Sequence, residues 1–503
     1  MRNGLQGYVL IALFSIVIAF FVDRSGRTPK ERAERRGYSY VYGDGTTGPK
    51  EERSRYTYGV PAAYLPVVFI FSWIFSVLLF GIRNAVFYQM GSTVSILISI
   101  CLYYIVLLPF LPLLRDHIRP MGIASLWVIP NILYISFYAF MTRNVPVHVL
   151  TVPRSVLFWA YRIWLLGFVL FLGRAVFLHL RFRKTLLSSC VPCENADLLA
   201  SFRDLKEYYC GSKGEYRLLI SKELQSPLSI GMFRRTICVV LPDQAYATED
   251  ADLIFRHELI HICRNDGAVK FFLTFCTALC WFNPLMYKAM RHCSEDLELS
   301  CDQLVLQDVG EEKTQRYASL ILESAGEPRG FTTCLAASAQ SLRYRLTELL
   351  KKEKKNASGA LLAGISVFLM LICLGSVTLA WDAGTVGSVI HANTEGNAVS
   401  IRSAQIFEKT GKYSQKVLAE HCSDPDRLLD RLDSMPCEEM LCSYRVEREE
   451  KTCLSIYAEA DGQNVWLAVY DHYATLNGGF PSVQRCFYLP ESVDWDVLFS
   501  LFE

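Results

Sequence analysis

Long apolar runs alternate with charged segments along this chain of 503 residues. Six of the runs come close to the roughly 20 residues that a helix needs to cross a bilayer. They are Leu5–Val22, Ala62–Phe80, Val94–Leu114, Met121–Met141, Val156–Leu180 and Gly359–Ala380. We predict a transmembrane bundle in residues 1–180 and a last transmembrane helix at 359–380. A cleaved signal peptide is the alternative for the first run, but no small-x-small site follows it, which favours an anchor.

Basic residues between the runs predict the orientation of the chain. Residues 23–59 hold nine basic and six acidic side chains, and further basic clusters follow the fifth run and precede the last. Lys and Arg in short loops favour the cytoplasmic side. An outside N-terminus with alternating spans puts all three clusters in the cytoplasm. We therefore expect a multi-pass protein of the plasma membrane, with residues 181–358 cytoplasmic and residues 381–503 extracellular.

The segment 181–358 has both strand and helix patterns. Tyr216–Ile220 and Thr236–Leu241 have the composition of strands, and Pro242 closes the second one. This second strand is either an edge that binds an extended peptide or an ordinary core strand. Thr248 is a candidate N-cap followed by acidic residues, and Asn265-Asp266-Gly267 is a stop signal, so a helix is predicted between them.

That helix contains His257-Glu258-Leu259-Ile260-His261. The two imidazoles are four residues apart and therefore lie on one helical face. This spacing is typical of a zinc site in which the intervening glutamate is the general base. With a third protein ligand, one position on the zinc stays open for a water molecule, which Glu258 can deprotonate. The predicted reaction is metal-assisted peptide hydrolysis.

The third ligand is predicted on the acidic helix that follows. Glu298 is assigned as this ligand, with Glu295, one turn earlier, as the fallback. Asp302, four residues after Glu298, is the candidate carboxylate for orienting a ligand imidazole from outside the metal's own ligands. The alternative is that these acids form a solvated face. Cys301 and Cys293 are softer candidate ligands that suit a closed structural site, and Cys301 is expected to pack as a small apolar residue.

An apolar stretch, Ala268–Met290, separates the two motifs and is long enough to cross the bilayer. A single crossing would put the metal ligands on opposite sides of the membrane. Asn283-Pro284 predicts a helix break, which would let segment 268–290 dip into the membrane and return. The alternative is a seventh span, which would destroy the site.

Several further segments accompany the two motifs in a particular order. They are Ser226–Phe233, Ile237–Pro242, Arg264 and Asp266, Trp281–Pro284, Glu298–Asp302, and Tyr317, Ala318 and Leu320. In these segments, over about residues 160–350, the chain resembles the bacterial membrane zinc metallopeptidase family of the BlaR/MecR-type beta-lactam sensor and antirepressor proteins. The resemblance departs at Arg235, where the family usually has a proline.

The resemblance implies a cytoplasmic, gluzincin-like α+β peptidase domain. It implies that zinc is bound by His257, His261 and Glu298 and that Glu258 is the catalytic acid/base. It also implies a protein substrate, which would be a cytosolic repressor, another membrane protein or the chain itself. The resemblance leaves the residue that stabilises the oxyanion unassigned, and Tyr317 is one of several candidates.

Residues 381–503 differ in composition, with 20 acidic and 10 basic residues. We predict a small extracellular α+β domain. Its expected helices are Ala404–Glu420 and Pro425–Leu432, and its expected strands are Leu441–Arg448, Cys453–Ala460 and Val465–Tyr470. A penicillin-binding sensor is not supported, because the tail is short, has no Ser-x-x-Lys motif, and carries Lys409-Thr410-Gly411 only in isolation.

The cysteines divide between the two sides of the membrane. Five of the 17 lie in the tail, where an oxidising exterior permits up to two disulfides, with Cys442 to Cys453 a plausible pair. The five are Cys422, Cys437, Cys442, Cys453 and Cys486. The other twelve are expected to be reduced, and Cys190 and Cys193 are expected to be an incidental pair.

Composition and charge narrow the function. Hydrophobic residues make up 51% of the chain, which is too apolar for an ordinary soluble enzyme. A net charge of +1 and the lack of a Gly-rich phosphate loop argue against nucleic acid as a direct partner. We predict an integral-membrane zinc endopeptidase in signal transduction that responds to an unknown external ligand. Whether the chain forms a homodimer is left open. The alternatives are a non-enzymatic receptor stabilised by zinc and a constitutive quality-control protease for membrane proteins.

Overall fold

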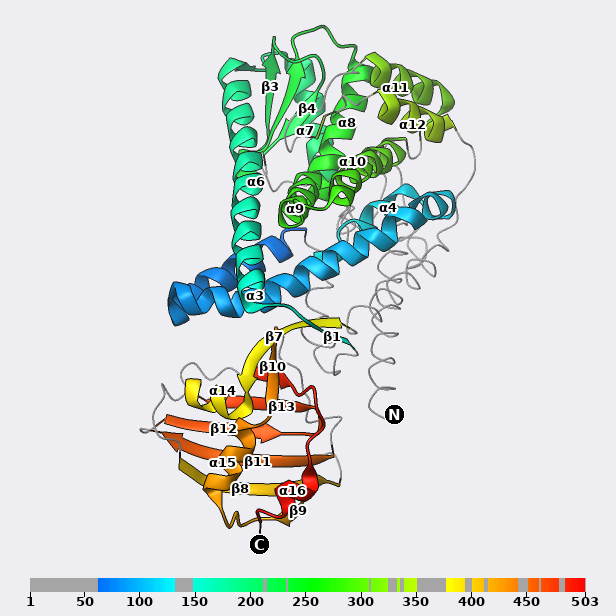
Figure 1. Cartoon of the computed structure of the whole chain (residues 1–503). Coiled ribbons are helices and arrows are strands. Elements are labelled where there is room, and N and C mark those ends of the chain that lie inside the picture. Colours follow the sequence, from blue (N-terminus) through cyan, green and yellow to red (C-terminus); the bar gives the residue numbers. More distant parts are fainter. Residues whose placement is uncertain are drawn as a thin grey trace.

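A computed structural model of the chain describes residues 62–131, 148–210, 215–231, 234–306, 309–323, 333–334, 339–350, 377–393, 400–410, 415–441, 451–460, 463–478 and 485–502. Figure 1 shows three parts: apolar helices across the middle, a mixed α/β part above them and a β-rich part below. The long helix α6 (Arg154–Ser189) runs from the level of the apolar helices up to the α/β part.

The apolar part is built from α3 (Tyr64–His117), α4 (Pro120–Leu126) and α6. Gly81 interrupts α3 with φ 72°, a left-handed conformation that glycine adopts readily, and it separates the first two predicted spans of this part. Beyond the break, the Gln89 side-chain amide donates to Ser72 O (2.8 Å) and Ser76 Oγ (2.6 Å), so the two arms of α3 lie against each other.

Two helical stretches in the part of the chain that the structure describes are long and apolar enough to span a membrane. They are Gln89–His117 and Arg154–Ser189, and Tyr64–Leu79 is a shorter apolar helix. Three predicted spans (62–80, 94–114 and 156–180) therefore fall in apolar helices. The first predicted span lies outside the described residues, as does most of the last, and the span at 121–141 is described only as far as residue 131.

The α/β part has a five-stranded sheet in the order β2-β3-β5-β4-β6. Its strands are β2 (Cys190–Pro192), β3 (Arg217–Ser221), β4 (Leu228–Ile230), β5 (Cys238–Pro242) and β6 (Thr333–Cys334). The pairs are antiparallel except for β3 with β5. Both predicted strands are present. The second, β5, is fully buried between β3 and β4, so the core-strand alternative was the right one. The two-residue strand β6 pairs with the other side of β4 and forms the edge. Arg235, in the 3-10 turn η2 (Arg234–Thr236), leads into β5.

Six helices are described in this part. They are α7 (Ala196–Cys210), α8 (Thr248–Arg264), α9 (Asp266–Leu279), α10 (Pro284–Val305), α11 (Glu311–Glu323) and α12 (Ala339–Leu350). The predicted zinc helix is α8, and Asn265 ends it in a left-handed conformation with φ 60°. The N-cap position is Ala247, which makes no side-chain bond, and Thr248 is already helical.

The apolar stretch between the two motifs is broken where Asn283-Pro284 predicts a break. α9 ends at Leu279, Pro284 is the first residue of α10, and the Asn283 side chain caps α10 by accepting from Leu285 N at 3.0 Å. α10 contacts both α9 and α8. The helix that carries the two histidines and the helix that carries Glu298 therefore meet.

The β-rich part is a nine-stranded sheet in the order β1-β7-β10-β14-β13-β12-β11-β8-β9. Its strands are β1 (His148–Thr151), β7 (Val377–Thr385), β8 (Ser400–Lys409), β9 (Gln415–Ala419), β10 (Pro436–Met440), β11 (Thr452–Ala460), β12 (Gln463–Val469), β13 (Tyr473–Gly478) and β14 (Arg485–Tyr488). Three short helices accompany it: α14 (Val386–Asn393), α15 (Pro425–Asp433) and α16 (Trp495–Phe499).

Two predictions for this part do not match the structure, and the strand predicted at Leu441–Arg448 lies outside the described residues after Leu441. The helix predicted at Ala404–Glu420 is wrong, because Ala404 and Ile406 are buried on alternate positions of β8, as a strand requires, and β9 follows. The predicted boundary at residue 381 is also too late. β7 begins at Val377, inside the predicted last span, and pairs in parallel with β1, which precedes α6.

The cysteines depart from the predicted pattern. Cys210 at the end of α7 and Cys263 in the last turn of α8 form a disulfide, with Cα atoms 5.6 Å apart, although both belong to the twelve expected to be reduced. In the tail, Cys422 and Cys437 are thiols. Cys442 lies outside the described residues, so the pair with Cys453 stays a prediction.

Candidate metal centre

Three side-chain atoms converge between α8 and α10. His257 Nε2 and His261 Nε2, one turn apart on α8, lie 3.1 Å from each other. Glu298 Oε2 on α10 lies 3.5 Å from each of them. All three residues are buried. The structure therefore brings together the two predicted histidines and the predicted glutamate.

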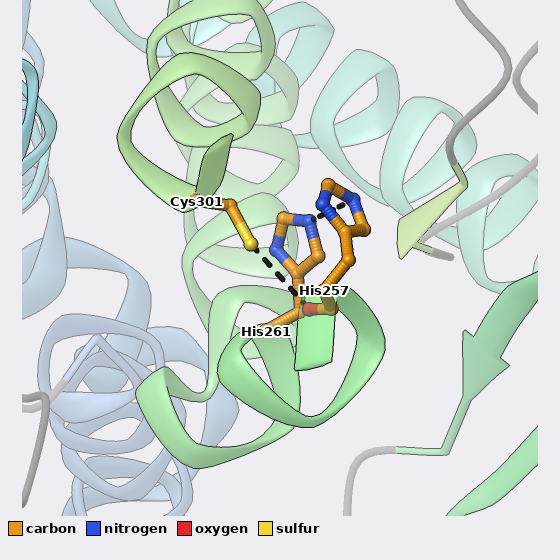
Figure 2. A group of neighbouring side chains, drawn as sticks. All are labelled: His257, His261 and Cys301. Carbon is orange, nitrogen blue, oxygen red and sulfur yellow. Dashed lines mark hydrogen bonds between the residues drawn. The ribbon is translucent and has the colours of Figure 1, made fainter. Parts of the chain in front are cut away.

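Cys301 is also near the two imidazoles, as Figure 2 shows. One ligand atom from each of His257, His261 and Cys301 lies within 4.8 Å of the others, so the thiol is a competing third ligand. However, Cys301 Sγ donates to the backbone oxygen of His257 at 3.4 Å. Glu298 Oε2 lies 3.5 Å from both Nε2 atoms. Two histidines with one glutamate form the ligand set of zinc peptidases that keep an open position. The geometry favours Glu298.

The charge state of Glu298 suits a metal ligand. Burial alone would raise the pKa of this carboxyl, but the positive charges of His261 and Lys270 hold the pKa well below its usual value. Lys270 Nζ lies 3.3 Å from Oε1. The other oxygen, Oε2, is buried and accepts no hydrogen bond from the part of the chain that is described. A cation placed between Oε2 and the two imidazoles would satisfy this oxygen, so the residues present fit a metal.

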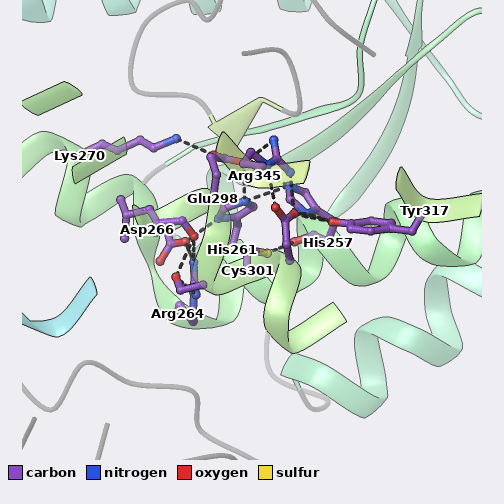
Figure 3. A network of polar contacts seen from close by, with 12 residues as sticks. His257, His261, Arg264, Asp266, Lys270, Glu298, Cys301, Tyr317 and Arg345 are labelled. Atoms are coloured by element: carbon purple, nitrogen blue, oxygen red, sulfur yellow. Dashed lines mark hydrogen bonds and ion pairs between the residues drawn. The ribbon is translucent and has the colours of Figure 1, made fainter. Parts of the chain in front are cut away.

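A chain of hydrogen bonds supports His257 from behind (Figure 3). His257 Nδ1 lies 2.7 Å from Tyr317 Oη on α11, and this hydroxyl donates to Asp302 Oδ1 at 2.8 Å. Asp302 itself lies 3.6 Å from Nδ1. Tyr317 therefore stands between the Asp302 carboxylate and the imidazole, and the role predicted for Asp302 stays a prediction. This places the Tyr317 hydroxyl behind His257, so it is engaged as a support rather than open to a substrate.

His261 has a support of its own. Its Nδ1 lies 2.5 Å from Asp266 Oδ2, and Arg264 in turn binds Asp266. Arg264 also donates to Ser300 Oγ at 2.7 Å and to Leu297 O at 2.9 Å, which ties the end of α8 to α10. Burial would raise the pKa of Asp266, but Arg264 and His261 hold it below its usual value. Such carboxylate–histidine pairs orient metal-binding imidazoles.

Glu258, the predicted base, is buried next to His257. Burial raises the pKa of its carboxyl, and the charges of His257 and His261 offset this only in part. The Ser229 side chain on β4 bonds to the Glu258 carboxylate and lowers its pKa. A carboxylate whose pKa is raised toward neutrality can both take up and return a proton.

The fallback ligand Glu295 lies elsewhere. It pairs with His292 Nδ1 (2.9 Å), Arg291 Nε (3.3 Å) and Arg115 Nη2 (3.7 Å). The next residue, Asp296, accepts from Arg115 Nη2 at 2.7 Å. These acids join α10 to the end of α3 rather than to the metal centre.

Sequence reasoning missed two residues of this centre. Asp266 enters the sequence analysis as part of a helix stop and of the family resemblance, without a role beside His261, although its position five residues later was available as a signal. Arg345 on α12 donates to Asp302 and lies 3.6 Å from Glu298 Oε2. Nothing in its local sequence points to a buried site, because its partners are more than forty residues away.

Comparisons with known proteins identify the family. Residues 69–349 match the family described as BlaR1 peptidase M56, and this range includes α8, α10 and most of α12. Over 187 residues the chain is 25% identical to the regulatory protein BlaR1 of Bacillus licheniformis. The aligned region covers 37% of this chain and only 30% of that protein. The resemblance found in the sequence is thereby confirmed. The chain belongs to the BlaR1 peptidase M56 family, whose members are metallopeptidases.

Proposed function

We propose that this protein is an integral-membrane zinc endopeptidase that acts in signal transduction. One observation carries the proposal: Nε2 of His257, Nε2 of His261 and Oε2 of Glu298 lie 3.1–3.5 Å apart although they come from two helices. Two imidazoles and a carboxylate would hold zinc and leave a position open, which suits catalysis better than structure. Family membership supports the same reading.

The reaction follows from the residues around this centre. Zinc, when bound there, would polarise the scissile carbonyl and acidify a water molecule. Glu258 takes the proton from the attacking water on a carboxylate oxygen and returns it to the leaving amine. Its raised pKa favours this double role. Tyr317 and Asp266 hold the two imidazoles in orientation through their Nδ1 atoms.

The edge of the five-stranded sheet supports an extended protein substrate. β4 contacts α8 and pairs on its outer side with the chain's own residues Thr333 and Cys334, antiparallel. The outer side of β4 can therefore hold an extended peptide through main-chain hydrogen bonds beside the metal centre. We propose that substrates pair in the same way. An unfolded segment of a cytosolic repressor, of a membrane protein or of the chain itself would fit.

Exposed apolar side chains along α6 support a location in the membrane. Trp159, Leu166 and Phe177 are 61–63% exposed, which is costly in water but favourable in lipid. α6 begins directly after β1 of the large sheet and ends at β2 of the small one. A bilayer around α6 would separate the two sheets. We propose that the zinc centre faces the cytoplasm and that residues 381–503 face outward, where they respond to a signal.

The test is a comparison of the full-length wild type with Glu258→Gln, purified in detergent. Glu249→Gln is the matched control, because Glu249 is exposed in the first turn of the same helix. Bound zinc is measured by atomic absorption, and cleavage of the protein itself and of casein is followed on gels. We expect zinc in all three proteins and cleavage in all but Glu258→Gln.

The other outcomes discriminate between functions. Zinc in every protein with equal cleavage in Glu258→Gln would remove Glu258 from catalysis. Zinc without cleavage in any of them would favour a receptor in which zinc only stabilises the fold. Absence of zinc from the wild type would overturn the proposal.

A further inference from the structure

Arg345 is a fully buried arginine in the polar network of Figure 3. It lies on α12, and its guanidinium binds the Asp302 carboxylate with two bonds, Nε to Oδ2 at 2.7 Å and Nη2 to Oδ1 at 2.6 Å. Its third nitrogen, Nη1, lies 3.6 Å from Glu298 Oε2. A buried arginine is uncommon unless it is fully paired, and a two-pronged contact fixes the orientation of the carboxylate as well as its charge.

The Asp302 carboxylate in turn determines which way the Tyr317 hydroxyl donates. A tyrosine hydroxyl has one hydrogen, and Tyr317 gives it to Asp302 Oδ1 at 2.8 Å. Its oxygen is then left to accept from His257 Nδ1 at 2.7 Å. This requires the imidazole proton to be on Nδ1. Nε2 of His257 therefore keeps a free electron pair, and this atom faces His261 and Glu298.

We propose that Arg345 is a positioning residue for the zinc centre, acting through Asp302 and Tyr317 on the tautomer of His257 and directly on the carboxylate of Glu298. The inference rests on the proposed function. If Arg345 is removed, Asp302 loses the two bonds that orient it, and Tyr317 is free to donate to His257 instead. The proton then moves to Nε2, which cannot bind a metal while it is protonated.

The location of Arg345 gives this role a regulatory meaning. α12 is the last described element before residues 351–376, which lead to β7 and the large sheet. The neighbouring residue, Tyr344, has its ring under the guanidinium of Arg115 at the end of α3, 4.9 Å from the ring centre. One helix therefore contacts both the metal centre and the apolar part. A shift of α12 would withdraw Arg345 from Asp302 and alter the centre.

The experiment compares Arg345→Gln, Arg345→Lys and Tyr317→Phe with the wild type, all full length in detergent. Arg343→Gln is the control, because Arg343 is exposed on the same helix. The readouts are the rate of zinc release to a chromophoric chelator and the visible spectrum after cobalt substitution. Neither depends on turnover.

We expect Arg345→Gln and Tyr317→Phe to release zinc about 10–100-fold faster and to change the cobalt spectrum. In other sites the loss of an outer partner of a metal ligand lowers the metal affinity by a similar factor. Arg345→Lys keeps the charge and should fall between.

Tyr317→Phe keeps the experiment decisive even if Arg345→Gln fails to fold, because it removes a single hydroxyl from the middle of the relay. Wild-type zinc release in folded Tyr317→Phe would overturn the inference. So would a lower melting temperature in Arg345→Gln with an unchanged cobalt spectrum, since that would make the arginine merely structural. A wild type that binds neither zinc nor cobalt would instead contradict the proposed function. Failure of the proposed function can therefore be distinguished from failure of the role inferred for Arg345.

Discussion

At the residue scale, the candidate centre contains several buried cationic side chains, and each of them is paired with a carboxylate. Lys270 pairs with Glu298, Arg264 with Asp266, and Arg345 with Asp302. Desolvating an ion costs several kcal/mol, so these groups are stable only as pairs. Removing one partner should therefore affect the metal centre more than the same change on the surface does.

The identity of the third ligand can be tested by three substitutions. Glu298→Gln removes the carboxylate that faces both imidazoles, so zinc affinity should fall by more than the roughly 100-fold that loss of an outer partner can cost. Glu295→Gln and Cys301→Ser should keep their zinc, because Glu295 pairs with His292 and Cys301 donates to a backbone oxygen. Zinc content after dialysis is the measurement. Zinc lost from Cys301→Ser but kept by Glu298→Gln would reverse the assignment.

Asp266 should matter through His261. Asp266→Asn keeps the size of the side chain but removes the charge that orients Nδ1, so we expect zinc affinity to fall about 10–100-fold. Competition with a chelator of known affinity measures this. Asp243→Asn, at an exposed position between β5 and α8, is the control and should bind zinc as the wild type does. Equal affinities in the two variants would remove Asp266 from the centre.

The sequence predicted the candidate ligands but only part of their support. The spacing of His257 and His261 is local, so helical geometry alone places both imidazoles on one face. Tyr317 lies 60 residues from His257, and Arg345 lies 43 residues from Asp302, so only the fold brings them together. Local patterns carry no information about such distant pairs.

At the element scale, β3, β5, β11, β12 and the helix break were predictable, because they rest on composition and on residues such as Pro284. The segment 404–420 was not. It contains Ile406, Val417 and Leu418 at spacings that fit a helical face loosely. The segment nevertheless forms a strand, because β8 pairs with β11. β1 was also missed, since its four residues join a sheet whose other strands begin at Val377. Pairing over such a distance overrides local preference.

An exposed ion pair joins the first turn of α8 to α11. Arg316 binds Asp250 through two bonds of 2.7 Å and holds the pKa of Asp250 below its usual value. A depressed carboxyl pKa adds stability that is present above the unfolded pKa of about 4 and is lost as the pH falls through the folded pKa. Arg316→Gln should therefore lower the melting temperature slightly at pH 7, and the difference from wild type should shrink as the pH falls below about 4.

Thermal melts at several pH values check this dependence. Lys313→Gln, an exposed change in the same helix without a described ion pair, is the comparison. A difference that grew as the pH fell would have the wrong sign for this pair.

The pairing of β6 with β4 predicts competition at the sheet edge. Thr333→Pro places a proline opposite Ser229, which disturbs the two-residue pairing of β6 with β4. We expect the edge to open more often and the cleavage of added casein to rise by a few-fold. Thr333→Ala introduces no proline and should behave as the wild type. If Thr333→Pro slows casein cleavage, then β6 assists substrate binding instead of competing with it.

At the scale of the whole molecule, one apolar cluster runs through all three parts. It includes Tyr104 of α3, Phe168 of α6, Phe272 of α9, Leu297 of α10 and Trp381 of β7. The candidate metal helix α10 therefore shares a core with the apolar helices and with the first strand after residue 376. Changes in the large sheet have a packed route toward the centre.

The proposed topology can be tested with single cysteines at two exposed lysines. Lys313→Cys lies on α11 near the metal centre, and Lys416→Cys lies on β9 of the large sheet. An impermeant maleimide applied to intact cells should increase labelling over the wild type for Lys416→Cys only. After lysis both variants should label. Labelling of Lys313→Cys in intact cells would place the peptidase part outside and reject the orientation.

The attachment of α6 has a mechanical consequence. The helix has 36 residues, which at about 1.5 Å each make a rod of about 54 Å, and only Val152 and Pro153 separate it from β1. At its far end Cys190 is already part of β2. A loop at either end would absorb torque, but here both ends are anchored by sheet hydrogen bonds. A rotation of the large sheet about the axis of α6 would therefore be transmitted through the helix to β2, because no flexible loop lies between them.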